Sequence, residues 1–282
     1  MESISKKIER LYNSFQDKQE DDSGTRYKSW EWCHKAFLDG KQRYRNANTD
    51  DQEKIVDLLC LHLAFYLASW GMYRGSTFLL QRDYKAHEKA VREIMNDSYK
   101  DLWDYSPQKE SLKTISELLF NKDSGIYWKI KKSYGKDTPT ETLVTKILLG
   151  TFGCIPAFDR YLKAGINCFC KGKDKDKCPI DTLENDPEKS FERIVLFAIA
   201  NKDELKIETA KSYPCMKCVD MFFWEIGYEI DLAAALKNKK TKKRRQQKLL
   251  EVAARHDFRN LNLKETTKAI DSSNQPGGSE KI

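Results

Sequence analysis

The sequence predicts an all-α fold: a multi-helix globular domain over residues 1–263, followed by a disordered C-terminal tail over residues 264–282. Three observations lead to this prediction. Apolar residues recur at helical spacing along most of the chain, as at Ile4, Ile8 and Leu11. Capping residues and glycines separate these segments. No alternation of apolar and polar residues indicates a strand ladder, and the tail ends in SSNQPGGSEKI, a composition typical of disorder.

Helices are expected in order along the chain. Residues 1–15 predict a short amphipathic helix, and residues 52–70, the most apolar segment, predict a central buried helix. Thr49 and Gln52 are expected to form a capping box at its start. The segment 126–134 is short and rich in aromatic residues, and its sequence does not decide between a helix and irregular structure. Further helices are expected at residues 30–45, 78–95, 110–120, 191–200, 204–212 and from 214 past 224, with a polar loop at 171–187.

The clearest local signals lie in residues 138–165, which predict a helix, a hairpin and a second helix. Thr138 and Glu141 suit a capping box around a proline at the first helical position. Gly150 suits the end of this helix, and Gly153 lies in the tight link that follows. The second helix is expected to start near Pro156 and to end at residue 165.

Composition indicates a soluble protein with a wet surface, since 40% of the residues are hydrophobic and 33% are charged. The longest apolar run, residues 58–72, is too short to span a bilayer, so no membrane partner is expected. The N-terminus carries charges where a signal peptide needs an apolar core, which favours the cytoplasm. The eight cysteines are therefore expected to be mostly thiols.

The positive charge is concentrated in one segment. Residues 237–248, KNKKTKKRRQQK, hold eight basic residues and no acidic one. Without them, the 50 basic and 43 acidic residues of the chain would nearly balance, at −1. A concentrated basic segment can neutralise several phosphates, which predicts a DNA or RNA partner. The alternative is a solvated linker. The candidate phosphate contacts are Lys239, Lys240, Lys242, Lys243, Arg244 and Arg245.

Two segments resemble a known family. Residues 143–162, LVTKILLGTFGCIPAFDRYL, resemble a segment of helix-hairpin-helix DNA glycosylase-like proteins, in which a helix with a lysine leads to a turn, a proline and an aspartate. Residues 217–227, KCVDMFFWEIG, resemble an Asp-x-x-x-Trp-x-x-Gly helix of some bacterial relatives of that group. Together they cover about 31 of the 282 residues. The family's closely spaced Leu-Pro-Gly-x-Gly glycines are absent, and Lys146 falls inside the first helix.

The resemblance implies DNA binding through the hairpin backbone and base excision with Asp159 as the candidate catalytic aspartate. Free amides at a hairpin and at a helix start can hold a phosphate, so Gly150, Gly153 and Arg160 are candidate nucleic-acid contacts. If they bind DNA, these amides should face solvent. The alternative for Asp159 is a local ion pair with Lys163.

Cysteines suggest a second kind of site. Cys215 and Cys218 form a Cys-x-x-Cys pair, a zinc half-site when a second pair lies close in space. The candidate second half is Cys168, Cys170 and Cys178, whose spacing is unusual for zinc. The alternative is a set of plain thiols.

A third candidate is Arg82 with His87, which has the Arg-x4-His spacing of HEPN ribonucleases. The resemblance covers six residues and implies RNA cleavage by a toxin or defence effector. Histidine is a competent acid or base near neutral pH, and arginine can hold a phosphate. Both side chains would have to meet at a cleft or dimer interface.

Three functions therefore stand as hypotheses: a nucleic-acid-binding protein related to DNA repair, an RNase-like effector, and a non-enzymatic interaction protein. No P-loop, nucleophile elbow, His-Glu-x-x-His or dinucleotide fingerprint is present in the sequence.

Overall fold

The computed structural model describes residues 3–16, 28–103, 105–170, 178, 180, 186–206 and 212–237. Within these ranges every regular element is a helix and no strand is present, which confirms the predicted all-α class. The predicted disordered tail, most of the polar loop and the basic segment beyond Lys237 lie outside the described residues.

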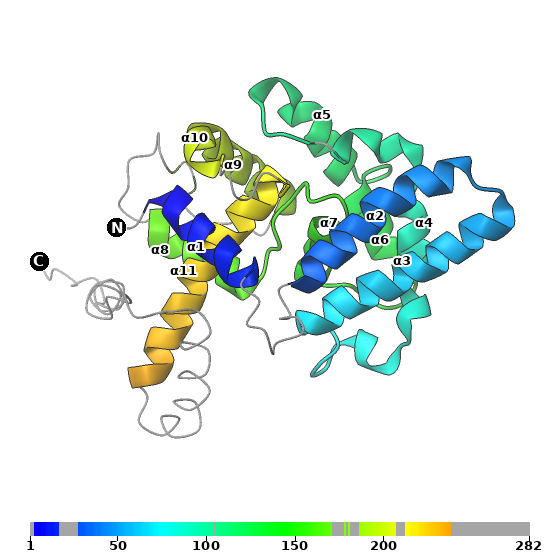
Figure 1. The fold of residues 1–282 in the computed structure, drawn as a ribbon, viewed down its shortest axis with the longest axis horizontal. Helices are drawn as coiled ribbons and strands as arrows, with labels where there is room; N and C mark the ends of the chain where they lie inside the picture. Colours follow the sequence, from blue (N-terminus) through cyan, green and yellow to red (C-terminus); the bar gives the residue numbers. More distant parts are fainter. Residues whose placement is uncertain are drawn as a thin grey trace, which may run out of the picture.

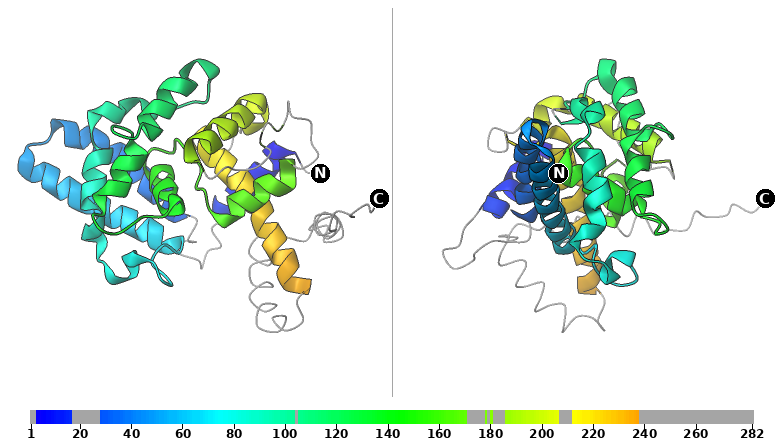
Figure 2. Two further views of the ribbon diagram at one scale, coloured as in Figure 1. Left: turned by 180° about the vertical axis from the view of Figure 1, so that it is seen from behind. Right: turned by 90° about the vertical axis from the view of Figure 1, so that its right-hand side faces the viewer.

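The helices form two groups that lie side by side (Figure 1). One group holds α2 (Lys28–Asn46), α3 (Thr49–Ser69), α4 (Glu88–Ile94), α5 (Lys109–Phe120), α6 (Ile126–Ser133) and α7 (Glu141–Thr151). The other holds α1 (Ile4–Gln16), α8 (Arg160–Cys170), α9 (Pro187–Ala200), α10 (Lys202–Leu205) and α11 (Cys215–Lys237). Seen from behind, α1 lies with α11 although it is the first helix of the chain (Figure 2).

One cluster of buried apolar side chains runs through both groups. In the first group α3 packs between α2, α4 and α7, and its apolar residues Leu59, Leu63 and Leu67 are at most 2% exposed. In the second group α11 is the central helix and contacts α1, α8, α9 and α10. Contacts between α5 and α9 join the two groups, together with the segment that leads from α7 to α8.

Several helix starts differ from the prediction because a nearby side chain caps the helix better. Asn48, and not the expected Thr49 and Gln52 pair, caps α3 by accepting from the amide of Asp51. The helix expected at residues 78–95 is broken into η1 (Phe78–Gln81), η2 (Tyr84–His87) and α4. Thr77 and Asp83 accept from amides two residues ahead and so start two separate 3-10 turns. A third such turn, η3 (Asp97–Leu102), follows α4.

The closest helix contact is the crossing of α8 and α11. α8 continues through Gly165, where the sequence predicted its end, to Cys170. A Cβ at Gly165 would lie 1.9 Å from the carbonyl oxygen of Phe223, and one at Gly227 would lie 2.0 Å from that of Tyr161. Gly165 is therefore required by the close approach of two backbones and not by a helix end.

Candidate functional site

Residues 138–165, where the sequence predicted a helix, a hairpin and a second helix, contain α7, a buried connecting segment and the start of α8. The side chain of Thr140, and not that of Thr138, accepts from the amide of Leu143 at 3.2 Å and caps α7. α7 extends past Gly150 to Thr151. Gly153 has φ +69° and donates its amide to the carbonyl of Leu148 at 3.1 Å, so it is the left-handed residue that closes this helix.

The segment between α7 and α8 is buried, which overturns the expected role of its glycines. Every residue from 143 to 158 is buried. The amide of Ala157 donates to Asp220 at 3.0 Å, and that of Phe158 donates to the hydroxyl of Thr145 at 2.9 Å. A Cβ at Gly150 would meet the ring of Tyr66. Gly150 and Gly153 therefore face the core, where a phosphate cannot reach them, and the prediction that they contact nucleic acid is wrong.

Asp159 caps α8 and pairs with Lys146. One carboxylate oxygen accepts from the amides of Tyr161 and Leu162 at 3.0 Å each, and the other accepts from the ammonium of Lys146 at 3.1 Å. The expected pair with Lys163 is wrong, since Lys163 bonds to Glu141 at 2.8 Å instead. At a cap position the carboxylate turns back toward the first amides of its own helix and away from the residue four positions on.

A second buried pair lies beside the first. Lys217 and Asp220, on the first turns of α11, bond at 3.1 Å with side chains 5% and 9% exposed. The ammoniums of Lys146 and Lys217 lie 5.3 and 5.7 Å from the centre of the Trp70 ring. We call Lys146, Asp159, Lys217, Asp220 and Trp70 the paired-lysine cluster. It joins the two sequence segments, 143–162 and 217–227, that were singled out above.

The paired-lysine cluster can hold two cations and two anions inside the protein, because each charge has a partner and the ring face attracts both ammoniums. The two oxygens of Asp159 together accept from three donors, two backbone amides and one ammonium. Asp220 also ties α11 to the connecting segment through Ala157. In this arrangement Asp159 acts as a helix cap and an ion-pair partner. The sequence reasoning missed Lys217 and Asp220, although both stand in the segment 217–227.

The chain matches no protein-family model, no curated protein and no solved structure. None of the described helices is both long and apolar enough to cross a membrane.

Arg82 and His87 do not come together. Arg82 is exposed and bonds to Asp137 at 3.0 Å, beside a cavity of about 320 Å³ that His87 does not line. The ring nitrogens of His87 each lie 2.7 Å from a tyrosine hydroxyl, of Tyr73 and of Tyr134. Burial lowers the pKa of His87 to about 4, so its ring is neutral at pH 7. His87 thus belongs to the core, and the RNase-like hypothesis has no accessible histidine here.

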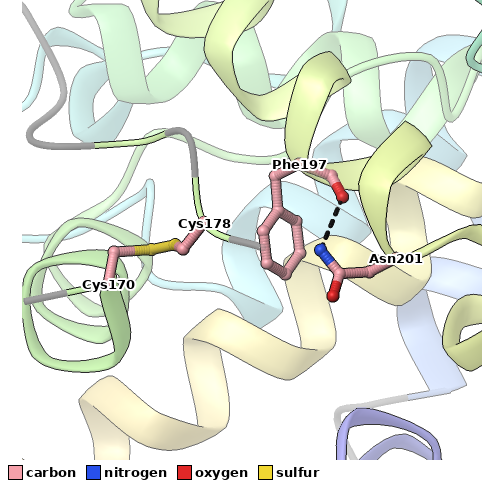
Figure 3. The surroundings of a disulfide bond; sticks show 4 residues. All are labelled: Cys170, Cys178, Phe197 and Asn201. Atoms are coloured by element: carbon pink, nitrogen blue, oxygen red, sulfur yellow. Dashed lines mark hydrogen bonds between the residues drawn. A yellow bond between two sulfur atoms is a disulfide. The ribbon is translucent and has the colours of Figure 1, made fainter. Parts of the chain in front are cut away.

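The five cysteines that were candidate zinc ligands do not form one site. Cys170 and Cys178 form a disulfide beside Phe197, whose carbonyl accepts from the side chain of Asn201 (Figure 3). The other six cysteines are free thiols, which agrees with the expectation that the cysteines are mostly thiols. Within the described residues no group of three or more His, Cys, Asp or Glu could hold a metal ion.

The remaining zinc candidates are isolated thiols. Burial raises the pKa of Cys215 to about 11 and that of Cys218 to about 12, so both remain protonated at neutral pH. Burial also raises the pKa of Cys168, although its side chain reaches the surface.

An aromatic face lies where α8 and α11 reach the surface. The side chain of Arg160 is 69% exposed, and its guanidinium lies 4.5 Å from the centre of the Tyr161 ring. Tyr161 contacts Tyr228 edge-on at 5.7 Å, and Tyr228 stacks on Trp224 at 5.0 Å. Asp231 accepts from the hydroxyl of Tyr161 at 3.1 Å. Trp224 itself is buried, at 7% exposed, and supports Tyr228 from beneath. We call Arg160, Tyr161 and Tyr228 the α8–α11 aromatic face.

Proposed function

We propose that the protein binds nucleic acid with the α8–α11 aromatic face and the basic segment 237–248. The observation that supports this proposal is their continuity: α11 carries the half-buried Tyr228 and ends at Lys237, where the basic segment begins. Along a helix the nine residues from Tyr228 to Lys237 span about 14 Å, a distance of a few nucleotides. The candidate base contacts and the candidate phosphate contacts therefore follow one another on the chain.

The two parts supply complementary interactions. The eight basic residues of the segment would neutralise phosphates and release counterions, which gives affinity without sequence preference. Arg160 adds an exposed guanidinium, paired with Asp231 at 3.5 Å, beside the half-buried rings of Tyr161 and Tyr228. Aromatic faces and arginine stack on unpaired bases, so single strands suit this arrangement better than duplexes.

Base excision is not included in this proposal. The carboxylate of Asp159 already accepts three hydrogen bonds from the protein. The segment between α7 and α8, which helix-hairpin-helix proteins would use to bind DNA, is buried. Binding should therefore survive Asp159→Asn in any folded sample.

Fluorescence anisotropy with labelled single-stranded DNA, single-stranded RNA and duplex DNA at several salt concentrations tests the proposal. We expect replacement of the six residues Lys239, Lys240, Lys242, Lys243, Arg244 and Arg245 by Gln to flatten the dependence of log K on log salt. For six phosphate contacts to single strands the slope should change by about 4.

Variants on the folded surface separate the two parts. Arg160→Ala should weaken single-strand binding by a factor of about 10 and change the salt slope by less than 1. Arg74→Ala, an exposed arginine between α3 and η1, is the matched control and should leave binding unchanged. Absence of binding at low salt, or a salt slope that the six-residue variant leaves as it was, would contradict the proposal.

A further inference from the structure

Large apolar side chains gather on the outer surface of α2 and α3. Leu58, Leu61 and Phe65 are 46%, 51% and 62% exposed, and their spacing of three and four residues puts them on one side of α3. Trp32 on α2 is 57% exposed. Exposed apolar residues scattered singly are ordinary, whereas a contiguous group marks an interaction surface.

The two helices share this surface. A hollow of about 630 Å³ is lined by Arg43 and Asn46 of α2 and by Lys54 and Leu58 of α3, so these residues face the same side. Trp32 precedes Arg43 by eleven residues, or three helical turns, and therefore faces that side as well. We call Trp32, Leu58, Leu61 and Phe65 with the lining of this hollow the α2–α3 face.

One contact fixes how the antiparallel helices are aligned along their length. A Cβ at Gly40 would lie 3.0 Å from the side chain of Leu59, so residue 40 is level with residue 59. Leu61 is then level with Leu38, near the middle of both helices. Trp32 and Phe65 lie toward one end of the face, and the hollow lies toward the other.

We propose that the α2–α3 face binds a second copy of this chain around a twofold axis that passes near Leu61, perpendicular to both helices. The face is self-complementary about this axis. The axis reverses the direction of α3 in the other copy, so residues at equal distances before and after Leu61 face one another. Phe65 lies four residues after Leu61 and Leu58 lies three before it, so Phe65 of each copy meets Leu58 of the other, beside the hollow. A protrusion and a hollow related in this way make an isologous, closed contact.

Charge supports the same arrangement. On α2, Trp32 lies six residues before Leu38 and Arg43 lies five residues after it. The axis therefore brings Trp32 of one copy next to Arg43 of the other. A guanidinium over an indole face is a favourable pair, and the axis forms it twice. A parallel arrangement would not form this pair.

Sedimentation velocity on the full chain tests this proposal. At about 1 to 100 µM protein and about 0.5 M salt, which suppresses bridging by nucleic acid, we expect a species of twice the 32.9 kDa chain mass. Leu61→Glu places two carboxylates together at the axis and should raise the dimer dissociation constant by at least about 100-fold. Leu80→Glu is the matched control: Leu80 is 49% exposed but belongs to η1 and not to α2 or α3, and the change should leave the mass unchanged.

Cross-linking tests the axis itself. In a Cys168→Ser background, which removes the exposed thiol, Leu61→Cys should form a disulfide between two copies on mild oxidation, and Leu80→Cys should not. Circular dichroism confirms that each variant is folded. The proposal is wrong if the wild type sediments at the mass of one chain throughout, if Leu61→Glu leaves the dimer intact, or if Leu61→Cys gives no cross-link.

Discussion

Replacing Gly165 by alanine tests the closeness of the α8 and α11 crossing. The new Cβ would lie 1.9 Å from the carbonyl oxygen of Phe223, while contacts of a real Cβ are essentially never shorter than 3.0 Å. The obstacle is backbone, which cannot rotate aside as a side chain would. The helices must therefore separate by about 1 Å or bend, and this opens the apolar contacts along their whole length.

The expected cost follows from two opposing effects. Overpacking of a rigid contact costs about 3 kcal/mol or somewhat more, whereas alanine in a helix interior gains about 1 kcal/mol over glycine. We expect Gly165→Ala to lower the free energy of unfolding by at least about 2 kcal/mol. Urea unfolding followed by circular dichroism measures the change.

Gly40→Ala is the matched control. Gly40 also lies inside a helix at a helix contact, but its nearest neighbours are the terminal atoms of Leu59, at 3.0 and 3.1 Å. A leucine side chain can give way, so the change should stay within about 1 kcal/mol of the wild type. A Gly165→Ala protein as stable as the Gly40→Ala protein would refute the close crossing.

Three further predictions concern buried charges. Lys146→Met leaves Asp159 buried without its lysine and should destabilise the fold by about 3 kcal/mol, while the double variant with Asp159→Asn should recover part of that loss in a urea double-mutant cycle. Glu225 is 2% exposed, and burial, reinforced by Glu229 and only partly offset by Arg10, raises its pKa to about 7. Because this folded-state pKa exceeds the unfolded value of 4.5, ionisation of Glu225 lowers the free energy of unfolding as pH rises from 4.5 through 7. The wild type should therefore lose about 3 kcal/mol of stability between pH 4 and pH 8, and Glu225→Gln should remove that loss. His87 has the opposite sign: its folded pKa of about 4 lies below 6.5, so stability is lost as pH falls from 6.5 to 4, and a His87→Asn protein should lack that slope of about 3 kcal/mol. If a Glu225→Gln or His87→Asn protein shows the same dependence of unfolding free energy on pH as the wild type, the pKa shift given for that residue is wrong.

The sequence was sufficient for the helical class because helical spacing and capping are local properties. Helix ends were predicted less well, since a cap one or two residues away, such as Asn48 or Thr140, can replace the expected one. The site could not be predicted from local signals. Asp159 pairs across thirteen residues with Lys146, and Ala157 bonds to Asp220 across 63.

The same limit explains the errors about exposure. Glycines and a proline between two helices are typical of a surface hairpin, yet here the segment is covered by α11 and by Tyr66 of α3. His87 has a polar neighbourhood in the sequence, but two tyrosines from distant positions enclose it. Burial of this kind depends on long-range packing, which no single segment encodes.

The place of α1 has a consequence for synthesis of the chain. Lys7 bonds to Glu229 at 2.9 Å, and 222 residues separate them. At about 5–20 residues per second, α1 leaves the ribosome roughly ten to forty seconds before the helix that buries it. The group from α2 to α7 is contiguous and can form in that interval, whereas the amphipathic first helix must wait with its apolar side uncovered. We therefore expect α1 to gain protection from amide exchange only when α11 does, as the last step in closing the second group.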